Sequence, residues 1–310
     1  MPEDTSSNIV AVVVTFNRRD LLARCLVALE RQTRPPDHIL VVDNASTDGT
    51  GAWLLERVGS ATVAMTAVTL PFNGGGAGGF SDGMRLGLEL GADWLWMMDD
   101  DAEPHDDALA ELLAVSPSRE HLYGSLAVAG DRSAWTTTLL TPEPVEVREA
   151  RLVPALAETL SLPFLGFLIH RELAGRLGLP DRDYFIAADD IEYCLRARRA
   201  GARIYIAGRS RIEHPASVVR KLHVLGVSVA FLSIPPWKRY YDTRNRLLNA
   251  RQYDPVGLIT RALPGTFVRL VAALWSEPRK WAQLRAVVAG MIDGLLGRKG
   301  IRHSTWRITP

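Results

Sequence analysis

The sequence predicts an α/β fold: a doubly wound, mainly parallel sheet with helices on both faces, followed by a C-terminal helical extension. Continuous β-branched runs such as residues 9–15 (IVAVVVT) are typical of strands that are covered on both faces. Amphipathic helical segments lie between these runs, and such an alternation indicates a parallel sheet. The chain has 310 residues, 47% hydrophobic and 23% charged, which suits one large domain plus an appendage.

The alternation of strands and helices is clearest in the N-terminal third of the chain. Strands are predicted at residues 9–15, 39–43, 63–70 and 94–98, and helices at 21–29, around 53–55 and at 80–90. Further along the chain, we predict an ordered segment at 164–169, a helix over 189–201, a strand over 203–206 and helices beyond Trp237. Residues 116–160 have a weaker pattern, in which we expect strands and a variable loop with proline turns.

Composition excludes several classes of protein. The formal net charge is +1, so global charge predicts no nucleic-acid partner. Cys25 and Cys194 have no CxxC spacing and fit helical cores, which indicates a reducing compartment rather than a disulfide scaffold. The polar start MPEDTSSN does not resemble a signal peptide, and no apolar stretch reaches the ~18 residues of a membrane span. We therefore expect a cytoplasmic protein, peripheral on the inner face of the cell membrane.

Polar clusters follow the predicted strands at the points where the strands end. They are Thr15 to Asn17, Asp43 with Asn44, Asn73 with Gly74, and Asp99 to Asp101. In doubly wound sheets, ligands bind beyond the carboxyl ends of the strands. The coincidence predicts one ligand site at this edge of the sheet.

The acidic triplet predicts a divalent metal site. In an extended strand end, residues i and i+2 point the same way, so Asp99 and Asp101 are expected to converge while Asp100 turns aside. Two carboxylates without a basic neighbour repel each other unless a cation lies between them, and Mg²⁺ or Mn²⁺ takes such oxygen ligands. The alternative is a solvated acidic loop or a helix cap for the segment after Pro104.

The glycine-rich run before the fourth predicted strand has two interpretations. Gly74, Gly76 and Gly79 match the GxGxxG dinucleotide fingerprint, with Asp99 downstream of them. That fingerprint belongs tight against its strand and has one acid, whereas residues 71–73 intervene here and three acids follow. A role in cradling phosphate or in close backbone approach is therefore favoured over NAD binding.

A second acidic cluster opens the helix predicted at 189–201. Asp189 and Glu192 are spaced as a capping box, which leaves Asp190 in the first turn, where the helix N-terminus favours an ionised carboxylate. Such a carboxylate suits a general base for a hydroxyl group. His214 follows the next strand, and a lone histidine is more often structural than a ligand.

Taken together and in order, the motifs resemble those of glycosyltransferase family 2. They are TFNR (15–18), VVDNASTD (41–48), FNGGGAGGF (72–80), WMMDDD (96–101), GFLIHR (166–171), AADDIEYCLR (187–196) and YYDTRN (240–245). The resemblance extends from residue 9 to about residue 250. It implies a GT-A fold over 1–236, with a nucleotide-binding half at about 1–101 and an acceptor-binding half at about 102–236. The helical pattern and the excess of Arg and Lys predict a basic helical region at 237–310.

The resemblance also implies roles for individual residues. Nucleotide-sugar contacts fall on Thr15, Asn17, Asp43, Asn73, Gly74, Gly75, Gly76, Asp99 and Asp100. Metal ligands for Mn²⁺ or Mg²⁺ fall on Asp99, Asp101 and His214, and the catalytic base falls on Asp190. Acceptor or diphosphate contacts fall on Gly166, Asp189, Tyr240, Tyr241, Arg244 and Asn245, the last four as a clamp. The implied reaction is one displacement that inverts the anomeric carbon.

Within the family, the motifs look most similar to bacterial galactofuranosyltransferases that start galactan on a polyprenyl-diphosphate-linked glycan. The implied donor is UDP-galactofuranose, and the implied acceptor is that lipid-linked glycan. Rhamnosyltransferases of cell-envelope synthesis share the YYxxRN segment, so a dTDP-rhamnose donor is the alternative. A non-catalytic protein that binds nucleotide sugars is a third. The long extra domains of polymerising enzymes are absent from this sequence, so transfer of one or a few sugars is expected.

The C-terminal region carries basic amphipathic segments with tryptophan. Residues 269–275 and 279–288 combine Arg and Lys with Trp275 and Trp281. Helices of this kind lie in anionic membrane interfaces. The alternative is a helical hairpin packed on the core or on a second copy of the chain, which would make a homo-oligomer.

Overall fold

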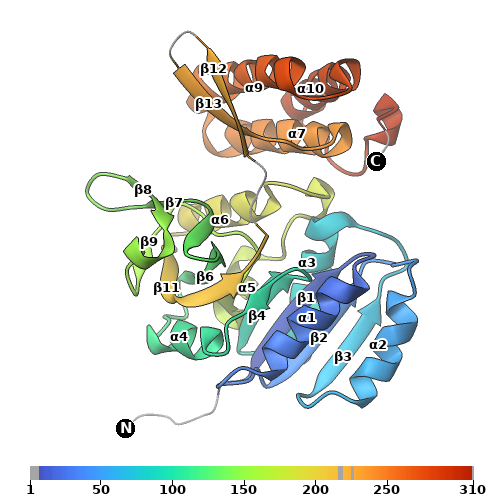
Figure 1. The fold of residues 1–310 in the computed structure, drawn as a ribbon, viewed down its shortest axis with the longest axis vertical. Helices are drawn as coiled ribbons and strands as arrows, with labels where there is room; N and C mark the ends of the chain where they lie inside the picture. Colours follow the sequence, from blue (N-terminus) through green and yellow to red (C-terminus); the bar gives the residue numbers. More distant parts are fainter. Residues whose placement is uncertain (1–6, 216–218, 225–226, 309–310) are drawn as a thin grey trace. The chain divides into compact units, whose positions relative to one another are not determined.

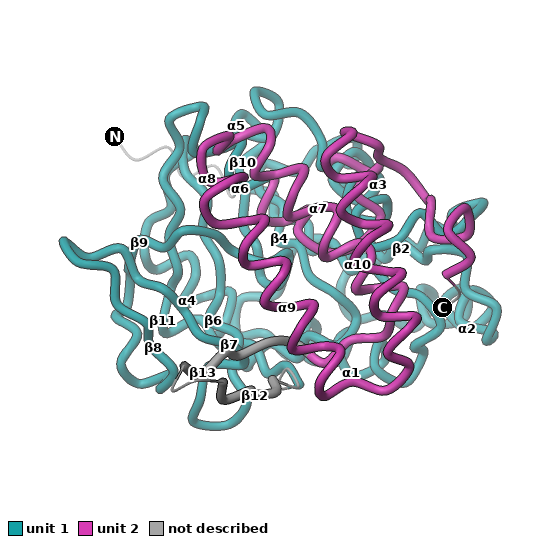
Figure 2. The backbone as a smooth tube through the Cα atoms, turned by 90° about the horizontal axis from the view of Figure 1, so that it is seen from above, with its two compact units in different colours: residues 1–180, 193–216 teal, residues 181–192, 217–310 magenta. Residues whose placement is uncertain are grey.

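The computed structural model describes residues 7–215, 219–224 and 227–308. These residues form two compact units (Figure 2): unit 1 is residues 1–180 with 193–216, and unit 2 is 181–192 with 217–310. The segment 181–192, which holds Asp189 and Asp190, thus groups with the C-terminal helices. The predicted division at residue 236 stays a prediction.

The main sheet of unit 1 is mainly parallel on its N-terminal side (Figure 1). Four parallel strands lie in the order β3 (Met65–Thr69), β2 (His38–Asp43), β1 (Ile9–Thr15), β4 (Trp94–Asp99). The sheet continues with β10 (Phe167–His170), β6 (Leu122–Ala129), β11 (Ile204–Glu213) and β5 (Glu103–Pro104). β10 is antiparallel to both β4 and β6, whereas β11 is parallel to β6. The predicted doubly wound, mainly parallel sheet is confirmed.

A smaller group of strands branches from this sheet in the region of weak pattern. β7 (Arg132–Leu139) pairs with β6 and with β8 (Val145–Glu149), and β9 (Ala157–Glu158) pairs with β11. A 3-10 turn, η1 (Ala150–Leu152), follows β8. The expected strands within residues 116–160 are therefore present.

Two hydrophobic cores lie on opposite faces of the sheet. Ile9, Ala11 and Val13 of β1 enter one core, and Val10, Val12 and Val14 enter the other, which explains why the whole strand is apolar. The first core is covered by α1 (Arg19–Glu30), α2 (Thr50–Gly59) and α4 (Ala108–Ala114). The second is covered by α3 (Gly75–Glu89), α5 (Arg171–Leu177) and residues 193–197 of α6 (Asp189–Arg199). Cys25 and Cys194 are buried in these cores, as predicted.

α3 approaches the sheet closely because glycine recurs on one face of the helix. A Cβ atom added at Gly79 would lie 2.4 Å from Val14 Cγ1, and one at Gly83 would lie 2.6 Å from Val12 Cγ1. At Gly87, the added atom would lie 2.4 Å from a methyl group of Leu95. The helix expected at 80–90 thus begins earlier, at Gly75 within the glycine run, and Gly79 of that run serves close packing.

Unit 2 is built from helices. They are η2 (Arg182–Tyr184), α7 (Pro236–Tyr253), α8 (Pro255–Gly257), the π-helical η3 (Leu258–Ala262), α9 (Leu263–Ser276), α10 (Lys280–Leu295) and η4 (Ser304–Trp306). A hairpin, β12 (Val219–Val224) and β13 (Val227–Leu232), also belongs to this unit. α7 and α10 pack closely, since a Cβ at Gly290 would lie 2.7 Å from the carbonyl oxygen of Tyr240. Phe185, Tyr240 and Tyr241 form its aromatic core.

The expectation that no segment is long and apolar enough to span a membrane is wrong. Among the described residues, the helical run Pro255–Ser276 is long and apolar enough to cross a membrane, and 22% of its apolar 18-residue window is buried. It was missed because Arg261 and Arg269 interrupt the run. Length and composition alone are weak evidence for a span, since core helices of soluble proteins pass the same test.

Candidate functional site: a donor edge and an acidic helix start

The carboxyl ends of β1, β2 and β4 lie at the same edge of the sheet. Thr15 pairs in register with Asp43 of β2, and Val14 pairs with Asp99 of β4. The predicted cluster of polar side chains after these strands is therefore brought together within unit 1. We call it the donor edge.

Asp43 is fully buried at this edge and is held by its neighbours. Its Oδ1 accepts a hydrogen bond of 3.0 Å from the Ser46 amide, and its Oδ2 accepts one of 3.2 Å from the Thr69 hydroxyl. The carboxylate is thus fixed in one orientation at the end of β2. Asp43 is 0% exposed here, so its predicted contact with a nucleotide stays a prediction.

Asn17 shapes the loop that follows β2. Its backbone is left-handed, with φ 52°, a region that asparagine enters more readily than most residues. Asn17 Oδ1 accepts a 2.7 Å hydrogen bond from the Thr47 amide, and its own amide donates to Ser46 Oγ at 2.8 Å. Asn17 therefore joins the loops after β1 and β2.

The glycine segment forms the start of α3. Asn73 Oδ1 accepts a 2.8 Å hydrogen bond from the Gly75 amide, and Gly75 has a left-handed φ of 72°. Asn44 Nδ2 donates a 3.0 Å hydrogen bond to the Gly75 carbonyl and so ties β2 to this helix start. Gly76 has no atom within 4 Å of an added Cβ, so packing does not require glycine there. Amide groups at a helix N-terminus favour anions such as phosphate.

The acidic triplet departs from the extended geometry that we predicted. β4 ends at Asp99, and Asp100 and Asp101 form a turn. Asp100 is buried and turned inward, where its Oδ2 accepts a 2.8 Å hydrogen bond from Thr15 Oγ1. Burial raises the pKa of Asp100, and the Thr15 hydroxyl and the Arg18 charge act in the opposite direction. The expectation that Asp99 and Asp101 converge while Asp100 turns aside rested on an extended strand end, and it stays a prediction.

A basic neighbour of the triplet was missed. Arg18 Nη1 lies 3.2 Å from Asp100 Oδ1 and 3.0 Å from Asp101 Oδ2. The premise that these acids lack a basic neighbour is therefore wrong. Arg18 is the last residue of the TFNR motif, and that position directly after β1 could have suggested it.

His214 contacts the triplet. It follows β11, its Nε2 lies 3.5 Å from Asp101 Oδ1, and its ring packs edge-on against Trp135. Its Nδ1 is buried and has no hydrogen-bond partner within the described part of the chain. Among residues 7–215, 219–224 and 227–308, no group of three or more His, Cys, Asp or Glu side chains is placed to hold a metal ion. Oxygen and nitrogen donors at Asp101 and His214 nevertheless suit Mn²⁺, which accepts both.

The backbone conformation and the close neighbours of residue 166 require a glycine at this position. It has a left-handed φ of 70°, and an added Cβ would lie 2.5 Å from Ile212 Cδ1 and 2.6 Å from Ser125 Oγ. Its carbonyl accepts a hydrogen bond from the Ser125 amide. The predicted acceptor contact at Gly166 stays a prediction, while the structure assigns it a packing role in unit 1.

Asp189 and Asp190 begin α6 within unit 2. The helix starts at Asp189 itself, so Asp189 is the first helical residue and not the predicted cap. Asp190 Oδ1 accepts a 2.7 Å hydrogen bond from the Ile191 amide. The third acid of this helix start, Glu192, accepts a 2.5 Å hydrogen bond at Oε1 from the Tyr253 hydroxyl.

Burial dominates the ionisation of this acidic pair. It raises the pKa of Asp190, and the Ile191 amide and the Arg246 charge only partly offset it. The pKa of Asp189 is also raised, first by burial and then by the charge of Asp190. The prediction that the helix N-terminus keeps Asp190 ionised thus identified a real contribution but not the largest one. The two carboxyl groups disfavour simultaneous ionisation.

The four YYDTRN side chains predicted as a clamp lie inside unit 2. Tyr240, Tyr241, Arg244 and Asn245 are each 0% exposed. Tyr240 donates to Asp293, and Tyr241 bonds His303. Arg244 and Asn245 donate to backbone carbonyls of residues 183–187 and of Gly300. A direct clamp on diphosphate is therefore not what the structure shows, because internal partners already satisfy these groups.

Comparison with known proteins identifies the family. Residues 10–148 match the model described as glycosyl transferase family 2. The galactofuranosyltransferase GlfT1 of Mycobacterium tuberculosis (strain ATCC 25618 / H37Rv) is 34% identical over 254 residues, which cover 78% of this chain and 81% of GlfT1. The chain belongs to glycosyltransferase family 2.

Two further comparisons place this glycosyltransferase among its relatives. The dTDP-rhamnosyl transferase RfbF of Shigella flexneri is 23% identical over 303 residues, 95% of this chain and 98% of RfbF. The mannosyltransferase PcManGT of Pyrobaculum calidifontis, solved in complex with GDP-Man and Mn²⁺, superposes with a TM-score of 0.58 and 18% identity, covering 95% of this chain and 89% of that chain. The second likeness confirms the predicted GT-A-like fold. The sequence-based identification as a glycosyltransferase is likewise confirmed.

Proposed function

We propose that this glycosyltransferase moves galactofuranose from UDP-galactofuranose to a hydroxyl of a polyprenyl-diphosphate-linked cell-envelope glycan, with inversion at the anomeric carbon. The observation that carries the proposal is the similarity to GlfT1, which spans 81% of that protein at 34% identity. The ordered motifs of the donor edge and of the α6 start support it.

The donor edge is proposed to hold the nucleotide sugar. Asp43, fixed by Ser46 and Thr69, would accept hydrogen bonds from the nucleobase, with Thr15 and Asn17 beside it. Asn73 and Gly74 to Gly76, at the start of α3, would receive the ribose and diphosphate, with Asp99 and Asp100 as further contacts. Backbone amides at this helix start favour the diphosphate charge.

Asp190 is proposed as the general base. It takes the proton of the acceptor hydroxyl, whose oxygen forms a bond to the anomeric carbon as the bond to the leaving diphosphate breaks. The electron pair of that broken bond leaves with the diphosphate. Burial, which raises the pKa of Asp190, makes its carboxylate a stronger base than an exposed aspartate. Asp189 and Gly166 remain proposed acceptor contacts.

Asp99, Asp101 and His214 would hold Mn²⁺ or Mg²⁺, which would supply positive charge beside the diphosphate. One observation supports this fit: His214 Nε2 lies 3.5 Å from Asp101 Oδ1. Arg18 already supplies one positive charge to Asp101. Competition between Arg18 and the ion is therefore expected.

A dTDP-rhamnose donor is the alternative. The similarity to RfbF carries it, since that alignment spans 95% of this chain, at 23% identity. A panel of UDP-galactofuranose, UDP-galactopyranose and dTDP-rhamnose with a synthetic lipid-diphosphate glycan separates the donors. Transfer from UDP-galactofuranose supports the proposal, and transfer from dTDP-rhamnose alone contradicts it.

Asp190→Asn tests the base and also the non-catalytic alternative. The variant should lose turnover and still bind UDP, because the side chain keeps its shape and loses its basicity. The matched control is Asp183→Asn, an exposed carboxylate of the same unit. Transfer at the wild-type rate by Asp190→Asn would contradict the proposed base, and absence of transfer by the wild type with every donor would favour a binding protein.

We also propose that unit 2 contacts an anionic membrane surface. Trp275 at the end of α9 and Trp281 at the start of α10 are 76% and 83% exposed, and Arg279 and Lys280 lie between them. Phe267 and Ile259 add further exposed apolar area. Tryptophan beside basic residues suits the interface of anionic lipids, where a lipid-linked acceptor would be found. A second copy of the chain on this face is the competing arrangement.

A further inference from the structure

The backbone immediately before Asp189 and Asp190 is strained. Phe185, Ala187 and Ala188 have left-handed φ values of 64°, 70° and 60°, although none is glycine. Phe185 has ψ −62°, and the Ile186 amide donates a 2.8 Å hydrogen bond to the Tyr184 carbonyl. This is the geometry of a γ-turn of the rare, strained form. Such conformations persist only where the surrounding structure imposes them.

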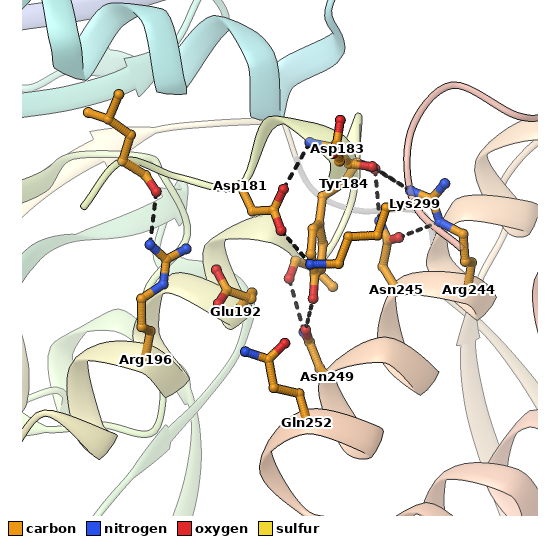
Figure 3. Close-up of polar contacts among 12 residues, drawn as sticks. Asp181, Asp183, Tyr184, Glu192, Arg196, Arg244, Asn245, Asn249, Gln252 and Lys299 are labelled. Carbon is orange, nitrogen blue, oxygen red and sulfur yellow. Dashed lines mark hydrogen bonds and ion pairs between the residues drawn. The ribbon is translucent and has the colours of Figure 1, made fainter. Parts of the chain in front are cut away.

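Side chains of α7 impose this conformation through the loop's own carbonyl groups (Figure 3). Asn245 Nδ2 donates to the carbonyl of Tyr184 at 3.0 Å, and Asn249 Oδ1 accepts a 2.6 Å hydrogen bond from the Tyr184 hydroxyl. Asn245 Nδ2 also donates to the carbonyls of Ile186 at 2.9 Å and Ala187 at 2.7 Å, and Asn249 Nδ2 donates to that of Ala188 at 3.0 Å. The carbonyls of residues 184, 186, 187 and 188 are thus satisfied by side chains of α7.

Arg244 adds a second layer of contacts. Its Nη2 donates to the carbonyls of Asp183 at 3.1 Å and Tyr184 at 2.9 Å, and its Nε donates to Asn245 Oδ1 at 2.8 Å. The last contact orients the Asn245 amide, so that its Nδ2 faces the loop. Arg244 therefore fixes both the start of the loop and the side chain that holds its middle.

The contacts follow the geometry of the helix. Asn245, Asn249 and Tyr253 are spaced by four residues and share one face of α7. Tyr253 bonds Glu192 in the first turn of α6 at 2.5 Å. Asp189 and Asp190 therefore lie between two points held by α7, namely Ala188 before them and Glu192 after them. We call Arg244, Asn245, Asn249 and Tyr253 the α7 ladder.

We propose that the α7 ladder positions Asp190 for catalysis by holding the strained loop 184–188 and the start of α6. This inference rests on the proposed role of Asp190 as general base. The ladder residues are positioning residues, since they act through the backbone and not on the substrate. Without them, the loop would relax toward ordinary φ values and displace Asp190, and a displacement of about 1 Å costs about a hundredfold in rate.

Asn249→Ala is the most specific test because it removes the donor to Ala188, the residue next to Asp189. Asn245→Ala removes three contacts to the loop and is the stronger variant. Arg251→Ala is the matched control, an exposed residue of the same helix. Asn249→Asp keeps the side-chain volume and the acceptor for Tyr184, but it replaces the donor to Ala188 with an oxygen and, when ionised, adds a buried negative charge. It is therefore the second variant, which removes the contact without opening a cavity.

The measurements distinguish a displaced Asp190 in a folded enzyme from a partly unfolded enzyme. For Asn249→Ala, we expect kcat for UDP-galactofuranose to fall by about tenfold to a hundredfold, with the donor KM and the UDP-binding stoichiometry nearly unchanged. The acid limb of the rate–pH profile should also move, since a displaced Asp190 has a different environment. Unfolding of a fraction of the enzyme would scale the whole profile and lower the UDP stoichiometry instead. Amide hydrogen exchange of residues 185–190 should accelerate.

The outcomes distinguish this inference from the proposed function. If Asp190→Asn abolishes transfer while Asn249→Ala and Asn249→Asp keep the wild-type kcat and pH profile, the positioning role is wrong and the base remains. If Asp190→Asn transfers at the wild-type rate, the base assignment itself is wrong, whatever the ladder variants do. Unchanged hydrogen exchange of residues 185–190 in Asn245→Ala would also contradict the inference, and it requires no activity.

Discussion

Arg18 and Asp101 form an ion pair at the edge of the sheet, with Arg18 Nη1 3.0 Å from Asp101 Oδ2. The same guanidinium nitrogen lies 3.2 Å from Asp100 Oδ1. A permanent cation thus neutralises part of the charge that would attract a divalent ion. Because Arg18 is about half exposed, the ion pair is screened by solvent and its strength is modest.

Arg18→Gln should therefore increase the affinity of the protein for Mn²⁺ when no nucleotide is present. An exposed ion pair contributes about 1 kcal/mol or less, so the gain should be no more than about fivefold. Calorimetric titration with Mn²⁺ measures it. Arg24→Gln is the control, since Arg24 pairs with Glu103 on the exposed surface of the same unit. Weaker Mn²⁺ binding by Arg18→Gln would mean that Arg18 organises the acids instead of competing with the ion.

The rate of transfer should depend on the ionisation of Asp190. A base must be ionised, and burial raises the pKa of Asp190 above its ordinary range. Activity should therefore be lost as the pH falls through a value above that of an exposed aspartate. Arg246 lowers the pKa of Asp190, so Arg246→Gln should move the acid limb of kcat/KM to higher pH. Arg251→Gln should leave it in place, and an unchanged limb in Arg246→Gln would argue that the limb reports another group.

How far the sequence predicts this molecule depends on the range of the interactions involved. Strands such as β1 and β4 were predictable because burial on both faces demands a continuous apolar run. The antiparallel insertion of β10 between β4 and β6 was not, because it is decided by pairing between distant segments. β11 also runs on to Glu213, well past the predicted Ile206, since its outer half pairs with β5 and β6.

The residues of the candidate site also divide into those that the sequence could predict and those that depend on distant contacts. Residues at strand ends, such as Asp43 and Asp99, were found because chain direction fixes the edge where they lie. The left-handed residues Phe185 and Ala187 gave no signal, since no glycine marks them and their conformation is imposed by α7. Arg244 looked like a phosphate ligand because its chemistry allows that role, and only its burial shows that backbone carbonyls use its donors.

Asp189→Asn should stabilise the protein more at alkaline than at acidic pH. Burial and the Asp190 charge raise the pKa of Asp189 in the folded state. The stability that protonated Asp189 contributes is therefore fully present below its unfolded-state pKa, and it is lost as the pH rises through the folded-state pKa. Asparagine does not ionise, so the variant escapes that loss. We expect Tm of the variant relative to wild type to be higher at pH 8 than at pH 5 by about 2–4 °C. Asp183→Asn, which changes an exposed carboxylate, should show no such trend.

Alanine substitutions in α3 distinguish glycines that the packing requires from glycines that can be replaced. Gly79→Ala would place a methyl group 2.4 Å from Val14 Cγ1, and the resulting strain should lower the free energy of unfolding by about 1–3 kcal/mol. Gly78→Ala in the same helix meets no atom within 4 Å, and alanine favours helix by about 1 kcal/mol. Urea unfolding of the two variants measures both effects. Equal stabilities would show that α3 can move away from β1 without cost.

Trp275 and Trp281 should determine binding of the chain to anionic vesicles. Both are more than three-quarters exposed, and Arg279 and Lys280 lie between them in the chain. Burying one such side chain contributes about 1.5–3 kcal/mol, so Trp275→Ser and Trp281→Ser should each weaken co-sedimentation with phosphatidylglycerol vesicles by about tenfold or more. Leu55→Ser is the control, an equally exposed apolar residue of unit 1. If the tryptophan variants bind vesicles as the wild type does and instead dissociate an oligomer in light scattering, this face packs against a second copy of the chain.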